Sequence, residues 1–442
     1  MLMIESMIFM VSFLFLNFNL YKKLYFVSNM MFLLSFLMLS MNGFFMDWVS
    51  LSMNFGLNFY SYGIIILILW IFGLVFMSIN QEKNFVLCLN LLILMLVILL
   101  MNFFSMNMLM FYFFFEVSLL IIFFLIMKWG MGFLRIYASY YLMFYTLFFS
   151  LPLLLVLFYL FNLMGSMSFL LLEGMMYKLN KILFLYLIIG FLVKMPMYMI
   201  HGWLLKAHVE APVFGSMILA AILLKLGSYG LLRLMMIFFQ NFLEMSGYFI
   251  EIGLMGSIIL SLNCFRQIDM KILVAMSSVV HMNLLMSSMF TMSKLSFLGS
   301  YLMMIAHGLC SSGLFYLLNL CYLETHSRLM IINKGVLIFM PSMSLMWFLM
   351  CSSNMAAPFS LNLVGEIFLL MSLVNWLMLL MIKLFFYCLI SFMYSLYFFS
   401  FIVHGKNFFY KSLSSGKLIN YLILLFHWIP LNLIILNLSI FI

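Results

Sequence analysis

The chain is a succession of apolar runs of about 20 residues separated by short polar loops. An α-helix rises about 1.5 Å per residue, so a run of this length crosses a hydrocarbon layer of ~30 Å. The strict alternation of apolar and polar residues that marks an outer-membrane barrel is not the pattern here. Of 442 residues, 68% are apolar and 7% are charged, which is more apolar surface than a soluble domain can enclose. The sequence predicts an all-α polytopic membrane protein and excludes a soluble enzyme, a nucleic-acid-binding domain and a disordered chain.

About 14 runs are long enough to span a membrane, and they are 2–20, 24–41, 59–79, 85–104, 107–127, 136–161, 181–204, 213–239, 248–264, 271–289, 295–320, 335–381, 384–403 and 418–440. The run 335–381 is too long for one straight helix and contains Pro358 near its middle. It is either two crossings or one helix broken at that proline. Pro196 interrupts the run 181–204 in a similar way.

Basic residues are distributed unevenly between alternate loops. When the loops are numbered from the N-terminus, the odd loops carry most of the Lys and Arg residues, and the even loops contain only Lys178, Lys181, Lys294 and Lys383. Loops rich in Lys and Arg remain on the cytoplasmic or matrix side of a membrane. We therefore expect the odd loops on that side and both termini on the other. The asymmetry is clean only if 335–381 is a single crossing.

When the charges assigned to the loops and loop edges are set aside, six charged residues remain in the apolar runs. Glu5 and Arg233 are close to run ends, and we expect their side chains to reach the membrane interface. The other four lie deep, where each costs about 2.5–3.5 kcal/mol even on a lenient insertion scale, and they are Glu116, Lys194, Lys225 and Glu366. One interpretation is two buried ion pairs, each glutamate with one lysine. The other is a proton path, because burial lowers the pKa of a lysine and raises that of a glutamate, and a pair whose separation changes can take up and release a proton.

Two histidines extend this second interpretation. His281 and His307 lie in consecutive runs, between the second deep lysine and the second deep glutamate in sequence. A lone buried histidine is more often a hydrogen-bonded core residue, so a structural role and a relay role both stay open. We expect His201 and His208, which flank Lys206 at a run end, to meet interfacial water.

The six cysteines show neither a C-x-x-C pair nor metal-ligand spacing. We interpret them as small apolar residues rather than disulfides or cluster ligands. The scattered histidines likewise give no haem pair by spacing. We therefore expect no redox centre and no metal on this chain.

Several motifs, in order over about 105–405, resemble the antiporter-like, proton-translocating subunits of respiratory complex I. They are Val193-Lys194-Met195-Pro196, Lys206-Ala207-His208-Val209-Glu210-Ala211-Pro212, Leu224-Lys225-Leu226-Gly227, Ser277-Ser278 ahead of His281, Ala306-His307-Gly308, and Asn362-Leu363-Val364-Gly365-Glu366. Thr325-His326-Ser327-Arg328 resembles the chain 4 branch of that family rather than the chain 2 or chain 5 branch. Leu205 and Phe359 stand where the family usually has proline, and Ser228 where it usually has glycine.

The resemblance implies a fold and a division of the chain. It implies about 14 helices, with three in 1–84, two inverted five-helix repeats at 85–240 and 248–403, and a loop and last helix in 404–442. The seventh and twelfth helices are expected to be broken. The departures at Leu205 and Phe359 lie beside the two breaks and leave their geometry to the structure.

The resemblance also implies roles. Glu116 would pair with Lys194, Lys225 would pass the proton to a central axis containing His281 and His307, and Glu366 would face the exit. The chain would then be a subunit of the proton-translocating NADH:ubiquinone reductase of the mitochondrial inner membrane. It would lie among other complex I subunits, especially neighbouring antiporter-like ones, and membrane lipids, without nucleic acid. NAD, FMN, iron–sulfur clusters and ubiquinone would be bound elsewhere in the complex. A stand-alone cation/proton antiporter, a haem-bearing respiratory subunit and a structural scaffold are the alternatives.

Overall fold

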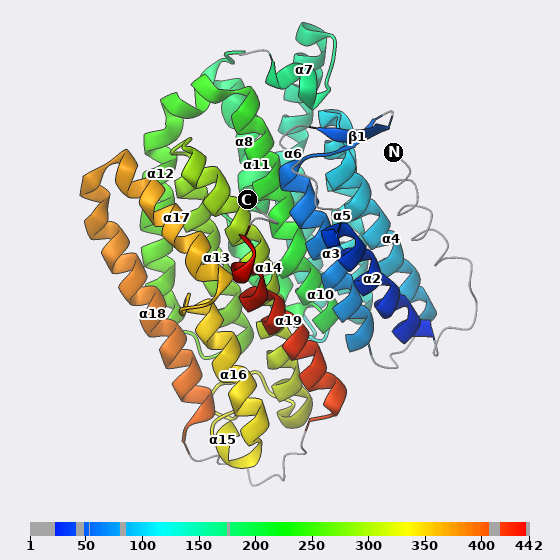
Figure 1. Ribbon diagram of the computed structural model, residues 1–442, viewed down its shortest axis with the longest axis vertical. Helices are drawn as coiled ribbons and strands as arrows, with labels where there is room; N and C mark the ends of the chain where they lie inside the picture. Colours follow the sequence, from blue (N-terminus) through cyan, green and yellow to red (C-terminus); the bar gives the residue numbers. More distant parts are fainter. Residues whose placement is uncertain are drawn as a thin grey trace.

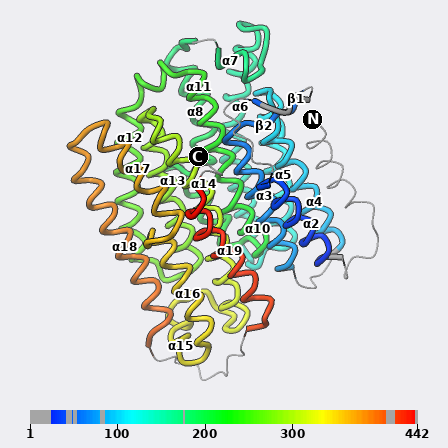
Figure 2. The backbone as a smooth tube through the Cα atoms, viewed as in Figure 1, coloured from blue at the N-terminus to red at the C-terminus, as the bar shows by residue number. Residues whose placement is uncertain are grey.

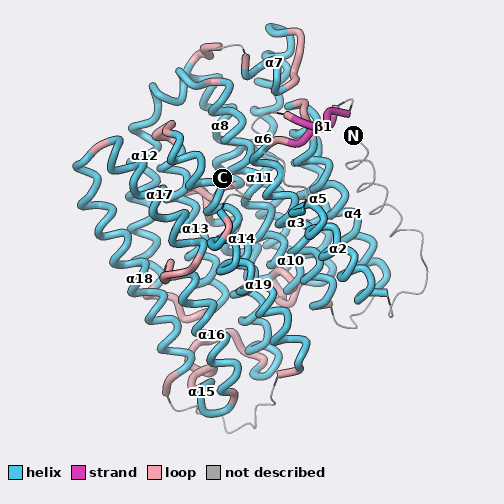
Figure 3. The backbone as a smooth tube through the Cα atoms, in the orientation of Figure 1, coloured by secondary structure: helices cyan, strands magenta, loops and turns pink. Residues whose placement is uncertain are grey.

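The computed structural model describes residues 23–40, 48–52, 54–79, 85–174, 177–405 and 416–438. Over these ranges the chain is a bundle of long helices lying side by side, with loops at the two ends (Figures 1 and 3). The predicted run 2–20 and Glu5 lie outside the described residues. We call the end with α7 and the β-hairpin, at the top of Figure 1, the even-loop face, and the end with residues 326–335 the odd-loop face.

The described helices are α2 (Lys23–Ser40), α3 (Phe59–Ser78), α4 (Phe85–Phe104), α5 (Met108–Trp129), α6 (Arg135–Met164), α7 (Phe169–Glu173), α8 (Lys181–Lys194), α9 (Gly202–Glu210), α10 (Val213–Ile218), the π-helix η2 (Leu219–Leu223), α11 (Leu224–Ile237), α12 (Phe239–Cys264), α13 (Met270–Met289), α14 (Lys294–Thr325), α15 (Val336–Phe339), α16 (Pro341–Asn354), α17 (Leu361–Trp376), η3 (Met378–Leu380), α18 (Met381–Val403) and α19 (Leu418–Leu436). Ten spans within the described ranges are long and apolar enough to cross a membrane. This confirms the prediction of a helical, polytopic membrane protein.

A short antiparallel hairpin departs from the all-α prediction. Its strands are β1 (Val49–Ser52) and β2 (Phe55–Leu57). The sequence Val49-Ser50-Leu51-Ser52 alternates apolar and polar residues, which is the period of a strand. Strands of four and three residues are much shorter than the apolar runs that span a membrane, so the pattern of runs does not reveal them.

The core of the bundle consists of helices that are buried nearly all round: α3, the continuous span α10–η2–α11, α13 and α14. Figure 2 shows α14 in the middle of the bundle, beside α13 and α19. The outer helices α6, α18 and α19 expose much of their apolar surface, including Phe148 and Phe385. A helix that is apolar on every side belongs either in a core or against lipid, so the outer faces are the surfaces that meet lipid or neighbouring chains.

Two crossings are broken at their middles. The first comprises α8 and α9, separated by 195–201, and the second comprises α16 and α17, separated by 355–360. A 14-residue helix spans about 21 Å, less than the ~30 Å of the hydrocarbon layer, so α8 or α16 cannot cross alone. In Figure 1, α16 lies low in the bundle and α17 continues above it. Residues 335–381 therefore form one broken crossing rather than two.

Candidate functional site

The first break places Lys194 at the C-terminal end of α8. Met195 closes the last turn by donating to the Phe191 carbonyl at 2.9 Å, and Met199 adopts a left-handed conformation with φ of +79°. The break frees the Val193 carbonyl, which accepts a hydrogen bond from Trp203 Nε1 at 3.0 Å. Because the C-terminal end of a helix carries a partial negative charge, a lysine at this position is electrostatically favoured.

Lys194 is buried and faces α5. Its Nζ donates to the backbone carbonyl of Phe115 at 2.9 Å and lies over the ring of the same residue. The Glu116 Oε1 atom is 3.9 Å from Nζ, and this buried oxygen has no hydrogen-bond partner. The pair predicted from sequence is therefore present, but the two charges interact across a gap rather than through a hydrogen bond. A small displacement of either helix would change their separation.

Lys225 lies directly after a π-helical turn that the sequence does not reveal. The turn η2 precedes α11, and π turns of this kind are frequent at functional sites. The Lys225 Nζ donates to the Ala220 carbonyl, within this turn, at 2.7 Å and lies 3.0 Å from His307 Nδ1. Lys225 is fully buried. Its charge is thus held by one backbone carbonyl and one imidazole instead of a carboxylate.

The polar chain continues from His307 to α17. The imidazole rings of His307 and His281 are 5.9 Å apart between centroids, and His281 Nδ1 lies 3.1 Å from Glu366 Oε1. The Tyr387 hydroxyl, on α18, is 3.4 Å from the same nitrogen. Glu366 therefore contacts a histidine, so the alternative interpretation as two lysine–glutamate ion pairs is wrong for the second glutamate. Lysine, imidazole and carboxylate in sequence are groups that can exchange protons.

The helices that carry the two lysines, α8 and α11, pack closely against each other. Gly227 lies at the contact, where a Cβ would be 2.9 Å from both the Phe191 carbonyl oxygen and the Met195 nitrogen. No larger residue fits without moving the end of α8. Gly227 thus sets the distance between the helix that ends at Lys194 and the helix that carries Lys225.

Two sequence expectations about polar side chains are wrong. His208 does not meet interfacial water: it is fully buried, its ring stacks on Phe315 at 4.5 Å, and neither of its nitrogens has a hydrogen-bond partner. Arg233 does not reach the interface either, because only 3% of its side chain is exposed. Both residues sit near run ends, and position in a run does not reveal that other segments fold over them.

A cavity of about 560 Å³ opens beside α9 on the odd-loop face. Its lining is mainly apolar and comes from α6, α9 and α13, with Lys206, Glu210 and Gln267 as the polar members. Glu210 also lies 3.8 Å from Arg328. Because α9 contributes to the lining, the cavity borders the helix that carries His208.

The described residues contain no group of three or more His, Cys, Asp and Glu side chains placed to hold a metal ion. The six cysteines are free, and all but Cys388 are buried. This arrangement agrees with their interpretation as small apolar residues.

The chain is similar in sequence to one family of known proteins. A family described as NADH:quinone oxidoreductase/Mrp antiporter matches residues 105–393. The NADH-ubiquinone oxidoreductase chain 4 of Apis mellifera ligustica is 48% identical over 393 residues, covering 89% of this chain and 88% of that protein. The chain 4 protein of Aedes aegypti is 50% identical over 396 residues, covering 88% of each.

Two solved structures share the fold. A chain of respiratory complex I from Thermus thermophilus with bound NADH aligns with a TM-score of 0.85 at 20% identity, covering 94% of this chain and 91% of that chain. A chain of the Mrp complex from Dietzia sp. DQ12-45-1b aligns with a TM-score of 0.82 at 17% identity, covering 94% of this chain and 48% of the other.

Proposed function

Because the chain belongs to the NADH:quinone oxidoreductase/Mrp antiporter family, and within it to the NADH-ubiquinone oxidoreductase chain 4 proteins, we propose that it carries protons across the mitochondrial inner membrane as a subunit of respiratory complex I. Electron transfer from NADH to ubiquinone drives this transport. The NAD, FMN, iron–sulfur and ubiquinone sites belong to other subunits. The motifs that predicted the family lie within the matched residues 105–393 for the most part.

The proton route runs from Lys225 through His307 and His281 to Glu366. The observation that carries this proposal is the line of close contacts, 3.0 Å from Lys225 to His307 and 3.1 Å from His281 to Glu366. The ring centroids of His307 and His281 are 5.9 Å apart. Proton transfer between these two histidines therefore requires motion of a ring or a bridging water.

The Lys194–Glu116 pair controls the proton on Lys225. When the pair opens, the positive charge of Lys194 is less neutralised and repels the charge on Lys225, because like charges disfavour each other in a medium of low dielectric constant. The 3.9 Å gap between the pair and its lack of a hydrogen bond support this role. The change that opens the Lys194–Glu116 pair would come from quinone chemistry elsewhere in the complex and would be transmitted through neighbouring antiporter-like subunits.

The sidedness follows from the loop charges. We place the odd-loop face on the matrix side and both termini on the intermembrane side. The cavity beside α9 and the buried His208 lie toward the matrix in this arrangement and supply the route of uptake. In the proposed organisation, about 14 helices include two inverted repeats at 85–240 and 248–403, and each repeat contains one broken helix near the bilayer centre, as in inverted-repeat transporters.

A stand-alone cation/proton antiporter is the second candidate. The shared fold with a chain of the Mrp complex favours it, whereas identities of 48–50% to chain 4 proteins over most of the chain favour the complex I subunit. Purification under mild conditions separates the two: the first proposal predicts that redox subunits co-purify with this chain, and a chain isolated without them would contradict it.

Replacement of Lys225 by alanine tests the proposed route. In assembled complex I of a genetically tractable relative, Lys225→Ala should reduce proton pumping at least tenfold, because proton-transfer groups typically contribute ~10²-fold or more. Pumping is measured as quenching of a pH-sensitive dye during NADH oxidation. Lys294→Ala is the matched control, since Lys294 is exposed at the start of α14, and should leave pumping unchanged. Normal pumping by an assembled Lys225→Ala complex would contradict the route.

A further inference from the structure

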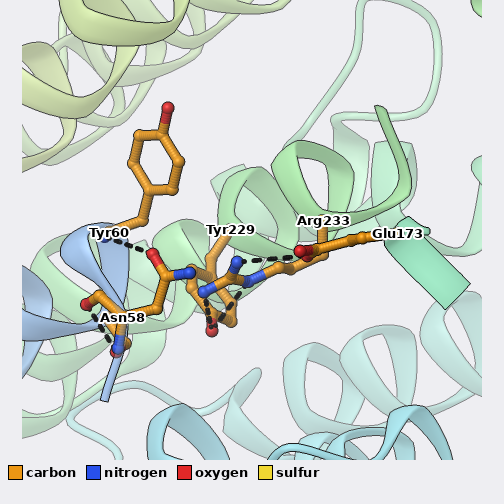
Figure 4. A network of polar contacts seen from close by, with 6 residues as sticks. Asn58, Tyr60, Glu173, Tyr229 and Arg233 are labelled. Atoms are coloured by element: carbon orange, nitrogen blue, oxygen red, sulfur yellow. Dashed lines mark hydrogen bonds and ion pairs between the residues drawn. The ribbon is translucent and has the colours of Figure 1, made fainter. Parts of the chain in front are cut away.

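Arg233 lies near the even-loop end of α11 yet is buried. Its Nε and Nη2 atoms both donate to the Tyr229 hydroxyl at 3.0 Å, and Nη1 lies 3.5 Å from Glu173 Oε1 (Figure 4). A guanidinium does not lose its proton in proteins, so this is a permanent positive charge. A buried cation within an apolar span is costly and is usually retained for a function. A single carboxylate at 3.5 Å does not explain the retention.

Aromatic rings surround the guanidinium. Its central carbon is 4.5 Å from the Trp48 ring, 4.9 Å from the Tyr229 ring and 5.8 Å from the Phe169 ring. The Trp48 and Phe169 rings are nearly parallel, with centroids 6.0 Å apart. Cation–π attraction stabilises a cation in such a position. The rings also exclude water from the space around it.

A cap of hydrogen-bonded backbone covers this cage. We define the cap as residues 48–52, 54–58, 105–107 and 167–173, which come from three separate connections between the long helices. Met106 N donates to the Asn54 carbonyl and Phe169 N to the Met106 carbonyl, both at 2.9 Å. Met108 N donates to the Met167 carbonyl, also at 2.9 Å. The even-loop end of α11 is therefore covered by fixed structure rather than by an open loop.

Arg233 also lies on the same face of α11 as Lys225. Lys225, Tyr229 and Arg233 are spaced four residues apart, which places them in one row along the helix, and eight residues correspond to about 12 Å along its axis. A proton leaving Lys225 directly toward the even-loop face would follow this row. It would meet an aromatic ring and then a fixed cation, whereas the way through His307 offers successive proton acceptors.

We propose that Arg233, with its aromatic cage and cap, seals the even-loop end of α11 against protons. The seal compels a proton on Lys225 to leave through His307, His281 and Glu366. A fixed cation that excludes protons from a membrane pore is a known physical device. This inference rests on the proposed function, since it assigns Arg233 a positioning role for the same route: it directs the proton without itself carrying it.

The test measures passive proton entry into vesicles that contain the assembled complex, without NADH. A potassium gradient with valinomycin provides the driving force, and pyranine inside the vesicles reports pH. Arg233→Gln removes the charge and retains hydrogen-bonding capacity, so proton entry should rise about tenfold, the factor expected for one elementary charge at about 12 Å and an effective dielectric of ~20. Arg233→Lys keeps the charge and should remain as tight as the parent. An unchanged rate in Arg233→Gln, or an equal leak in Arg233→Lys, would overturn the proposal.

Further variants protect the test against failure to assemble and identify the route. Tyr229→Phe removes the hydroxyl that accepts from the guanidinium but leaves the charge in place, so proton entry should stay as low as in Tyr248→Phe, its control at an exposed site on α12. A leak in Tyr229→Phe equal to that of Arg233→Gln would show that side-chain packing rather than the charge closes this end, and would overturn the seal. Adding Lys225→Ala to Arg233→Gln should restore a tight membrane, and a persistent leak would show that it does not start at Lys225.

The seal and the pumping route are tested separately. Normal NADH-driven pumping in Lys225→Ala would contradict the proposed function, whereas the passive leak of Arg233→Gln requires no turnover and decides on the seal.

Discussion

The two broken helices use the same backbone device with different charges. Both first halves have 14 residues and stop at the break, at Lys194 and at Asn354. In each, the carbonyl one residue before the end accepts a hydrogen bond from a side chain of the second half. Trp203 Nε1 donates to Val193, and Asn362 Nδ2 donates at 2.7 Å to Ser353, whose carbonyl also accepts from Ala356 N. Each break also contains left-handed residues, Met199 in the first and Ala356 and Phe359 in the second.

The charges at the two breaks differ in sign and in position. The first break has a lysine at the negative C-terminal end of its first half, and the second has Glu366 in the N-terminal half of α17, toward the positive end. The lysine faces a carboxylate across 3.9 Å, whereas the glutamate contacts an imidazole at 3.1 Å. A helix break can therefore accommodate a charge of either sign. The residues on the neighbouring helix determine whether that charged side chain belongs to an ion pair or to a proton relay.

Removal of the lysine at the first break should have the largest effect. Lys194→Ala removes the charge that, in the proposed function, controls the proton on Lys225, so proton pumping should fall roughly a hundredfold, the contribution typical of a group that takes part in proton transfer. Glu116→Ala should have a similar effect. Dye quenching with assembled complex measures both. Lys181→Ala, at the exposed start of the same helix, is the control. Normal pumping in both single variants, Lys194→Ala and Glu116→Ala, would show that the ion pair at the first break has no role in pumping.

Neutralising the acid at the second break should have an intermediate effect. Glu366→Gln keeps the size of the side chain and contact with His281 but removes the charge. Pumping should fall roughly tenfold, the weight of one hydrogen bond to a charged group, and Glu366→Asp should restore part of it. Quenching of the same dye gives the rate. An equal loss in Gln and Asp variants would mean that shape rather than charge matters at this break.

Removal of the side chains that donate to the broken backbones should have the smallest effect on pumping. Trp203→Phe leaves the buried Val193 carbonyl without its side-chain donor, at a cost of about 1–3 kcal/mol. After Asn362→Leu the Ser353 carbonyl still accepts from Ala356 N at 3.2 Å, so the loss of stability should be smaller. Thermal inactivation of the assembled complex measures both losses. Trp376→Phe, at a partly exposed site ending α17, should change nothing. An equal or larger loss of stability in Asn362→Leu would contradict this order.

The sequence predicted the charged parts of the site because an ionisable residue inside an apolar run is conspicuous. The Lys194–Glu116 proximity and the placement of His281 and His307 between Lys225 and Glu366 agree with those expectations. The resemblance at Lys194, Lys225 and Glu366 also predicted the family, which the comparisons confirm.

The parts that the sequence did not predict depend on packing between segments far apart in the chain. The π turn at Leu219–Leu223 consists of ordinary helix-forming residues, so no local signal marks it. The burial of Arg233 depends on two loops that fold over α11, at Trp48 and at Phe169. Gly227 is visible as a glycine, but its contact with α8 is a tertiary fact.

A double-variant cycle determines whether Lys225 and Glu366 are the two ends of one proton route. Protons pumped per NADH oxidised are measured for Lys225→Ala, Glu366→Gln and the combination. The effects of residues that act as one unit are strongly non-additive, so we expect the double variant to pump as many protons per NADH as the single variant with the larger loss. A double variant in which the two losses multiply would show that Lys225 and Glu366 have independent functions, and there would be no single route.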